Sequence, residues 1–326
     1  MSPETSSLPS PQSCHLPVIS LAGDPAQLPA QLGDSFARFG FAIVSDHGID
    51  PALIARGWDL TRALFVLPDS EKRRWHDPAL AGARGYTPFG REIAKGATAH
   101  DLKEFWHIGR DLAPDHPLAA AMPPNIWPVN IRLEQPADFA ETFRALYAAF
   151  DRTGARILRH IAVALGLAPG WFDPAIADGN SVLRLLHYPP VADAPEGAIR
   201  AGAHEDINLI TLLLGAEESG LELRARDGAW IEVAPPPGAL VINIGDMLQR
   251  LTNHALPSTT HRVRNPLGDR ARFSRYSMPF FLHLRSDFII TTLPQCISAD
   301  RPDQYPQAIT ADAYLQQRLR EIGLIA

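Results

Sequence analysis

The chain has 326 residues, a hydrophobic content of 46%, a formal net charge of −6 and a pI near 6.0. This is the composition of an ordinary globular protein that can bury most of its apolar surface. The acidic balance argues against nucleic acid as a partner, because phosphate binding needs a basic surface. No run approaches the roughly 20 apolar residues that a membrane-spanning helix needs, so we expect no membrane partner either.

Neither the cysteines nor the first residues form a recognisable functional motif. Cys14 and Cys296 lie at opposite ends of the chain, so they form neither a disulfide framework nor a zinc motif. Residues 1–13 are rich in serine and proline and have neither a basic region nor an apolar stretch of the kind found in signal peptides. We therefore expect a disordered tail over residues 1–14 and a cytoplasmic protein.

The N-terminal third alternates strand and helix patterns. Short apolar runs at 16–20 and 41–44 predict strands, and helical patterns at 28–38 and 52–65 predict helices. The stretch 77–96 is rich in glycine, alanine and proline and predicts a long loop, which in a compact enzyme is often functional.

The middle of the chain predicts one long helix, and the remainder predicts a β-rich core. Residues 137–167 place apolar side chains at the helical period, as a scaffold helix packed on a sheet would. Short strand patterns with turn residues between them then indicate a sandwich or barrel. They fall at 181–188, 209–214, 220–223, 230–233, 239–244 and 276–284. An amphipathic helix is predicted at 311–322.

Two histidines and one aspartate in the β-rich part have the pattern of a metal site. On a strand, His204 and Asp206 point to the same side while Glu205 points away. A second imidazole, His261, would come from a later strand. Such a set leaves half of an octahedral ion open, as in non-haem iron(II) oxygenases, and a site without cysteine argues against structural zinc.

An arginine and a hydroxyl follow on the next strand. Arg275 and Ser277 are two residues apart and offer a fork for a small dicarboxylate beside the metal. A His-x-Asp pair alone is common by chance. The later His-Arg-Val and Arg-x-Ser segments together argue against coincidence.

Several segments resemble the isopenicillin N synthase-like branch of the 2-oxoglutarate/iron(II) oxygenases. The signature segments are 204–206, 261–266 and 275–281, and further matching segments are 16–20, 40–48, 65–72 and 309–324. Residues 85–86 and 101–107 resemble a bacterial subgroup of this family. The resemblance implies a mainly β protein with flanking helices and a double-stranded β-helix (jelly-roll) core.

We accordingly expect four regions after the tail. They are an N-terminal α/β region at 15–135, scaffold helices at 136–180, the jelly-roll dioxygenase core at 181–290 and a C-terminal helix packing on the core at 291–326.

Carried over residue by residue, the resemblance implies that the iron ligands are His204, Asp206 and His261. It also implies that the distal carboxylate of 2-oxoglutarate is held by Arg275 and Ser277, and that Tyr188 contacts cosubstrate or substrate. The spacing between His261 and Arg275 is longer than in several relatives, and we expect a hairpin loop at 267–272 to absorb the difference. Arg270 and Arg272 lie nearby, but only Arg275 has serine two residues on.

The implied activity is oxidation of a small molecule, most simply hydroxylation. It would use Fe(II), 2-oxoglutarate and O2 and release succinate and CO2. The iron centre is the catalytic group, and we assign no separate acid or base residue. Three alternatives stay open: a 2-oxoglutarate-independent oxidase of the isopenicillin N synthase type, an ethylene- and succinate-forming enzyme, and a non-catalytic iron/2-oxoglutarate sensor. Neither the prime substrate nor the oligomeric state follows from the sequence.

Other polar and aromatic side chains are expected to be structural or are undecided. His187 should face away from Tyr188 into the scaffold, and His107 should pack in the core. Asp246 has the position of a turn or helix-cap residue, and His254 that of a solvated loop residue. A lid role and a structural role are equally open for Tyr86, Phe89 and Arg91.

Overall fold

The computed structural model describes residues 16–91, 101–128, 138–191, 199–215, 220–266 and 268–321. Some predicted features lie wholly or partly outside these residues. They are the tail at 1–14, the end of the loop at 77–96, the first residue of the helix at 137–167, the first residue of the hairpin loop at 267–272 and the last residue of the helix at 311–322.

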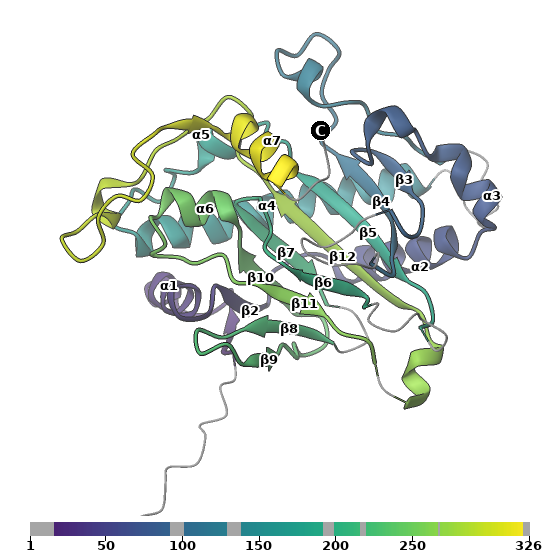
Figure 1. Ribbon diagram of the computed structural model, residues 1–326, viewed down its shortest axis with the longest axis horizontal. Coiled ribbons are helices and arrows are strands. Elements are labelled where there is room, and N and C mark those ends of the chain that lie inside the picture. Colours follow the sequence, from purple (N-terminus) through teal and green to yellow (C-terminus); the bar gives the residue numbers. More distant parts are fainter. Residues whose placement is uncertain are drawn as a thin grey trace, which may run out of the picture.

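The strands of the described part of the chain form two main sheets and one short two-stranded ribbon (Figure 1). The larger sheet, within these residues, has the order β1-β2-β10-β7-β12-β5-β4-β3. Its strands are β1 (Val18–Ser20), β2 (Phe41–Ser45), β3 (Gly85–Thr87), β4 (Glu104–Gly109), β5 (Val182–Tyr188), β7 (Ile210–Leu214), β10 (Leu240–Ile244) and β12 (Arg275–Leu282). The smaller sheet contains β6 (Ala201–His204), β11 (His261–Val263), β8 (Leu221–Arg224) and β9 (Trp230–Glu232). A separate ribbon pairs β13 (Ile289–Ile290) with β14 (Ile309–Thr310).

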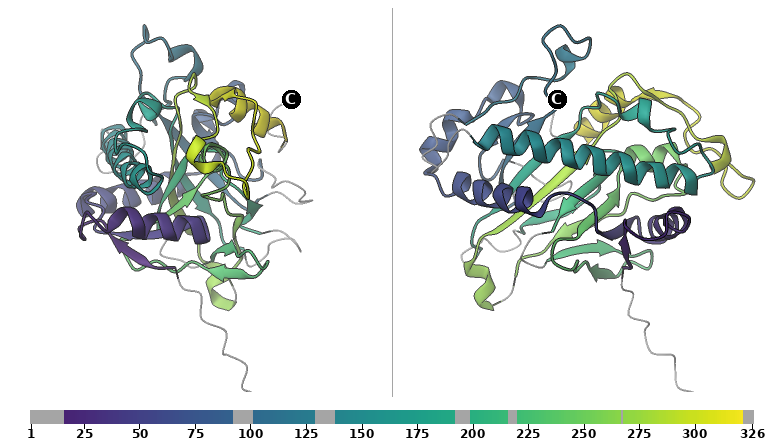
Figure 2. Two further views of the ribbon diagram at one scale, coloured as in Figure 1. Left: turned by 90° about the vertical axis from the view of Figure 1, so that its left-hand side faces the viewer. Right: turned by 180° about the vertical axis from the view of Figure 1, so that it is seen from behind.

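Helices cover the outer face of the larger sheet (Figure 2). The helices are α1 (Leu28–Phe39), α2 (Pro51–Phe65), α3 (Asp69–Lys72), α4 (Asp138–Ala164), α5 (Asp173–Ile176), α6 (Asp246–Leu251) and α7 (Ala311–Glu321). The long helix α4 packs aromatic residues on β12, where Phe280 stacks on Phe150 (ring centroids 5.6 Å apart) and meets Tyr147 edge-on. No helix of the described segments is both long and apolar enough to cross a membrane.

Strand alternation divides the larger sheet into two faces. On β5, Leu183 and Leu185 belong to the core under the helices, whereas Leu186 and Tyr188 belong to the core between the two sheets. Leu223 of the smaller sheet lies in that second core. Residues that face the space between the sheets are therefore the ones that can reach a site inside the jelly roll.

The observed fold confirms a mainly β protein with flanking helices, but one local prediction is wrong. The stretch 77–96 is not a continuous loop, because β3 lies within it and pairs with β4, with Tyr86 opposite Trp106. A three-residue strand that begins with a glycine has too few side chains to show alternation, and its partner β4 lies beyond the predicted loop. The division of the chain into four regions stays a prediction.

Candidate metal centre

His204, Asp206 and His261 come together between the two sheets. His204 ends β6 and is opposite His261, which begins β11. One ligand atom from each of the three residues lies within 4.8 Å of the other two. The Nε2 atoms of His204 and His261 lie 3.8 and 3.9 Å from the same oxygen, Asp206 Oδ1. Glu205 points elsewhere, and its carboxylate accepts a hydrogen bond from Thr260.

Backbone carbonyls fix the orientation of both imidazoles. The Nδ1 atom of His204 lies 2.7 Å from the Gly202 carbonyl oxygen, and the Nδ1 atom of His261 lies 3.1 Å from the Thr259 carbonyl oxygen. A carbonyl oxygen only accepts, so Nδ1 carries the proton in each ring and Nε2 keeps its lone pair. Phe41 meets His261 edge-on at 5.5 Å between ring centroids and limits its rotation.

The second oxygen of Asp206 is held by two side chains that the sequence analysis did not identify. Asp206 Oδ2 accepts a hydrogen bond from Thr211 Oγ1 at 2.5 Å and from Asn243 Nδ2 at 2.9 Å. Thr211 is on β7 and Asn243 is its register partner on β10. Both residues are buried. In the sequence, each is the one polar residue in a short apolar run, and this was the pattern that could have identified them. Their hydrogen bonds leave Oδ1 directed at the two imidazoles.

The surroundings keep His204 and Asp206 in the protonation states that a cation requires. Burial lowers the pKa of His204 to about 4, and His261 beside it acts in the same direction. Burial would raise the pKa of the Asp206 carboxyl. Its two histidine neighbours and its hydrogen bonds with Thr211 and Asn243 outweigh burial, so the pKa lies below the ordinary value. A neutral imidazole and an ionised carboxylate are the forms that bind metal.

This donor set fits iron(II). Two imidazole nitrogens and one carboxylate oxygen, without sulfur, match the facial triad of non-haem iron oxygenases and leave three positions for other ligands. Within the described residues, these three are the group of histidine, cysteine and acidic side chains whose ligand atoms are close enough to share one ion.

The predicted cosubstrate residues lie together at the start of β12. Arg275 is opposite Tyr188 of β5, and the guanidinium carbon of Arg275 lies 5.1 Å from the centre of the Tyr188 ring. The exposed fractions of Arg275, Ser277 and Tyr188 are only 2–3%. Because Arg275 and Ser277 are two residues apart on one strand, they face the same side of the sheet as Tyr188, between the sheets.

Further polar and aromatic side chains share this inner face and were not singled out as site residues. The guanidinium of Arg184 on β5 lies over two rings, 4.3 Å from the centre of Phe105 and 5.2 Å from that of Phe281. Its Nε atom donates to His107 Nε2 at 2.5 Å, while His107 Nδ1 lies 2.6 Å from the Gly82 carbonyl oxygen. The sequence could have indicated this position, because Arg184 is four residues before Tyr188 and alternate residues of a strand face the same side.

Three other residues considered in the sequence analysis make contacts that support the fold. His187 faces the helices, where its Nδ1 bonds to Glu104, as expected of a scaffold residue. Tyr86 is fully buried and also bonds to Glu104, so its position is structural. Asp246 is the first residue of α6 and pairs with Arg318 of α7 at 2.9 Å.

Two family models match the chain at these same regions. The N-terminal model, described as "non-haem dioxygenase in morphine synthesis N-terminal", matches residues 16–130. The model of the 2OG-Fe(II) oxygenase superfamily matches residues 179–284, which include all the predicted iron and cosubstrate residues. A 2-oxoglutarate-Fe(II) type oxidoreductase from Emericella nidulans, hxnY, is 34% identical over 88% of this chain and 82% of its own length.

Solved structures agree with these matches. A 2OG-Fe(II) oxygenase family protein from Caulobacter crescentus is 51% identical, with a TM-score of 0.86 over 94% of this chain and 99% of that chain. A full-length Neurospora crassa protein, crystallised with alpha-KG, is 29% identical, with a TM-score of 0.82 over 95% and 97% of the two chains. The chain therefore belongs to the 2OG-Fe(II) oxygenase superfamily, and it is a non-haem iron oxidoreductase that uses 2-oxoglutarate.

Proposed function

We propose specific roles for six residues in this dioxygenase. Iron(II) is held by His204, Asp206 and His261, and 2-oxoglutarate is held by Arg275, Ser277 and Tyr188. The observation that carries the first assignment is the approach of both Nε2 atoms to one oxygen of Asp206, with Nδ1 of each ring committed to a backbone carbonyl.

The cosubstrate assignment follows from charge and burial. The guanidinium of Arg275 offers a planar pair of N–H donors that matches a carboxylate, and burial strengthens such a bidentate pair. Ser277, two residues further along the same strand, offers a hydroxyl that would donate to the same carboxylate, and the Tyr188 ring packs beneath the Arg275 guanidinium. These residues orient the cosubstrate and exclude water. Bound iron supplies the coordination positions and the redox chemistry.

The substrate that we propose is a small organic molecule, and the reaction is its oxidation, most simply hydroxylation. Relatives with this fold include a proline hydroxylase, buaE, from Petromyces alliaceus and the Neurospora crassa protein, which was also crystallised in complex with alpha-KG and thymine. Arg184, with the Phe105 and Phe281 rings beside it, is our candidate for contact with such a substrate. That the protein binds neither nucleic acid nor a membrane, and that it is cytoplasmic, stay predictions from the sequence.

Release of succinate tests this function. Iron(II)-loaded protein should form succinate from 2-oxoglutarate in air, faster with a true substrate and in a one-to-one ratio with oxidised product. H261A and R275A provide the controls, with no turnover expected from H261A and a raised KM for 2-oxoglutarate from R275A. Oxidation of substrate without succinate would instead support the oxidase alternative. Ethylene in the headspace would support the ethylene-forming enzyme, and binding of 2-oxoglutarate without turnover would support a sensor.

A further inference from the structure

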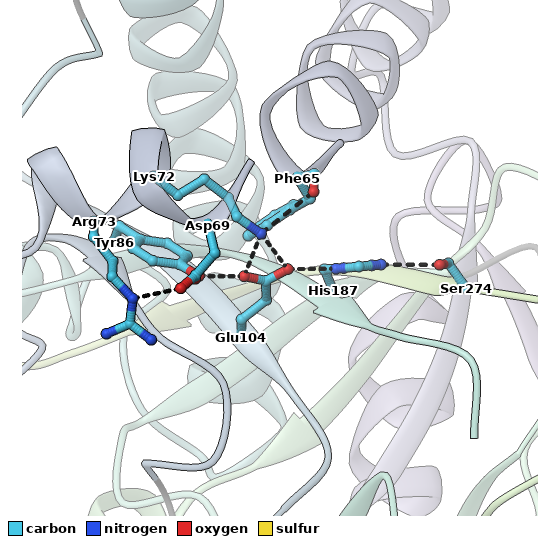
Figure 3. A network of polar contacts seen from close by, with 8 residues as sticks. All are labelled: Phe65, Asp69, Lys72, Arg73, Tyr86, Glu104, His187 and Ser274. Atoms are coloured by element: carbon cyan, nitrogen blue, oxygen red, sulfur yellow. Dashed lines mark hydrogen bonds and ion pairs between the residues drawn. The ribbon is translucent and has the colours of Figure 1, made fainter. Parts of the chain in front are cut away.

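Polar side chains around Glu104 form a network that extends through His187 to Ser274 (Figure 3). The Glu104 carboxylate, at the start of β4, accepts hydrogen bonds from Lys72 Nζ at 2.8 and 2.7 Å, from His187 Nδ1 at 2.7 Å and from the Tyr86 hydroxyl. All four side chains are buried. Burial would raise the pKa of Glu104, but the bonds from His187, Lys72 and Tyr86 outweigh it and lower that pKa. The carboxylate at the centre of the network is therefore ionised.

His187 extends the network to the strand that carries Arg275. Its Nε2 atom lies 2.9 Å from Ser274 Oγ, and its ring is stacked between Phe65 and Tyr276, with centroid distances of 5.4 and 4.8 Å. An ionised carboxylate only accepts hydrogen bonds, so His187 Nδ1 carries a proton and donates to Glu104. The imidazole is thus fixed in position, ring orientation and protonation at Nδ1.

The hydrogen bond between His187 and Ser274 joins two strands at the proposed cosubstrate residues. His187 immediately precedes Tyr188 on β5, and Ser274 immediately precedes Arg275 on β12. Arg275 and Tyr188 are register partners. Because alternate residues point to opposite faces, the link lies on the helix-covered face while Arg275 and Tyr188 face the interior of the jelly roll.

We propose that His187, held by Glu104, is a positioning residue for 2-oxoglutarate. Its hydrogen bond to Ser274 fixes the first residue of β12 and hence the direction of the Arg275 guanidinium. This inference rests on the proposed role of Arg275. The link matters because β12 begins directly after the turn at Gly268–Arg272 and Phe273, whose side chain is 61% exposed. A strand end beside an exposed turn opens easily, and bidentate binding of a carboxylate tolerates little displacement.

Removal of the Ser274 hydroxyl tests the proposal. S274A removes the hydrogen bonds of this hydroxyl with His187 and with the Tyr276 side chain. It should raise the dissociation constant for 2-oxoglutarate roughly fivefold, the effect of losing the bond to His187. The constant can be measured anaerobically on iron(II)-loaded protein by calorimetry. The affinity for 2-oxopentanoate, which lacks the distal carboxylate, should hardly change, so the preference for 2-oxoglutarate falls by the same factor. S274T keeps a hydroxyl and should restore the preference.

A second variant removes the same link from its other side. H187N places an amide where Nδ1 was and has no atom at the Nε2 position, so it should lower the preference for 2-oxoglutarate as S274A does. In the S274A/H187N double variant the preference for 2-oxoglutarate should fall no further than in S274A, because S274A already lacks the bond between the two residues.

A similar pair elsewhere in the chain provides the control. His254 Nε2 lies 2.6 Å from the Tyr305 hydroxyl, and the two rings are stacked with centroids 5.6 Å apart. Y305F therefore also removes a hydroxyl from an imidazole, outside the larger sheet. It should leave both affinities unchanged.

The outcomes separate this inference from the assignment on which it rests. If S274A and H187N lower thermal stability but leave the preference for 2-oxoglutarate over 2-oxopentanoate unchanged, the network only supports the fold and the inference is wrong. If R275A also leaves that preference unchanged, the proposed role of Arg275 fails as well. If only R275A loses the preference for 2-oxoglutarate, the positioning role of His187 is wrong, but Arg275 remains the residue that binds the distal carboxylate.

Discussion

The residues that hold Asp206 should determine how strongly the proposed centre binds a metal. Thr211 and Asn243 occupy one carboxylate oxygen, so the other is presented to the cation without competition. Outer partners of this kind typically contribute 10- to 100-fold to metal affinity.

Substitution of Thr211 should weaken iron binding without loss of the fold. T211V keeps the shape of the side chain and removes its hydrogen bond to Asp206, so we expect iron(II) affinity to fall roughly tenfold. Anaerobic competition with a chelating dye measures this affinity. T61V is a matched control, because the buried Thr61 hydroxyl bonds to the Gly57 carbonyl oxygen within α2. Equal iron affinity in T211V and wild type would contradict the assigned role of Thr211.

Iron affinity should depend on pH in a way set by His204. Its pKa, lowered by burial to about 4, lies below the ordinary 6.5, so protons compete with the metal at this ring only as the pH falls toward about 4. Asp206, whose pKa is also lowered, stays ionised over the same range. We therefore expect the part of the iron affinity that depends on His204 to be nearly constant from pH 7 to about 5 and to fall steeply below. A loss that begins near pH 6.5 would show a histidine with an ordinary pKa.

At the scale of elements, Gly40 lies against the segment that precedes His261, one of the proposed iron ligands. Gly40 lies between α1 and β2 with φ +68°, and a Cβ built there would lie 2.2 Å from Thr259 Oγ1 and 2.5 Å from the Pro257 carbonyl oxygen. The Thr259 carbonyl is the partner of His261 Nδ1. The segment that leads into β11 is therefore in close contact with the end of α1.

Substitution of Gly40 should affect stability and iron binding together. G40A forces a left-handed backbone on alanine and displaces the segment before His261, so we expect about 1–3 kcal/mol of lost stability and a reduced iron affinity. G90A is a control with equally positive φ, +74°, but open space at the Cβ position. Denaturant unfolding and the dye competition report the two effects. A G40A variant that loses stability and binds iron normally would show that the contact does not orient His261.

The residues of the proposed iron centre were easier to find in the sequence than the residues that hydrogen-bond to Asp206. The reason is that the former belong to short motifs, whereas the latter come from separate strands. His204 and Asp206 form one short motif, His261 begins a second, His-Arg-Val, and Arg275 with Ser277 forms a third. The hydrogen-bond donors to Asp206, Thr211 and Asn243, can be found only from the strand order, because β7 and β10 are neighbours only in the folded sheet. The strand β3 was missed for the same reason, since its partner β4 follows a long intervening segment.

For the whole molecule, ligand binding should stabilise the folded state. The proposed ligands come from distant parts of the chain, so the unfolded chain offers no equivalent site. Iron(II) at 100 times its dissociation constant adds about 2.7 kcal/mol, which for a chain of this size raises Tm by a few degrees. 2-Oxoglutarate should add a second increase in wild type and a smaller one in R275A. Anaerobic calorimetry with H261A as the reference checks this, and an equal iron-dependent rise in H261A would contradict it.

The most direct test of the three-residue iron centre is the visible charge-transfer band that iron(II) and 2-oxoglutarate form when they bind together without oxygen. We predict this band for wild type, its absence in H261A, and a weaker band at limiting 2-oxoglutarate in R275A. A band of unchanged intensity and position in both variants would show that the iron and its cosubstrate bind somewhere else.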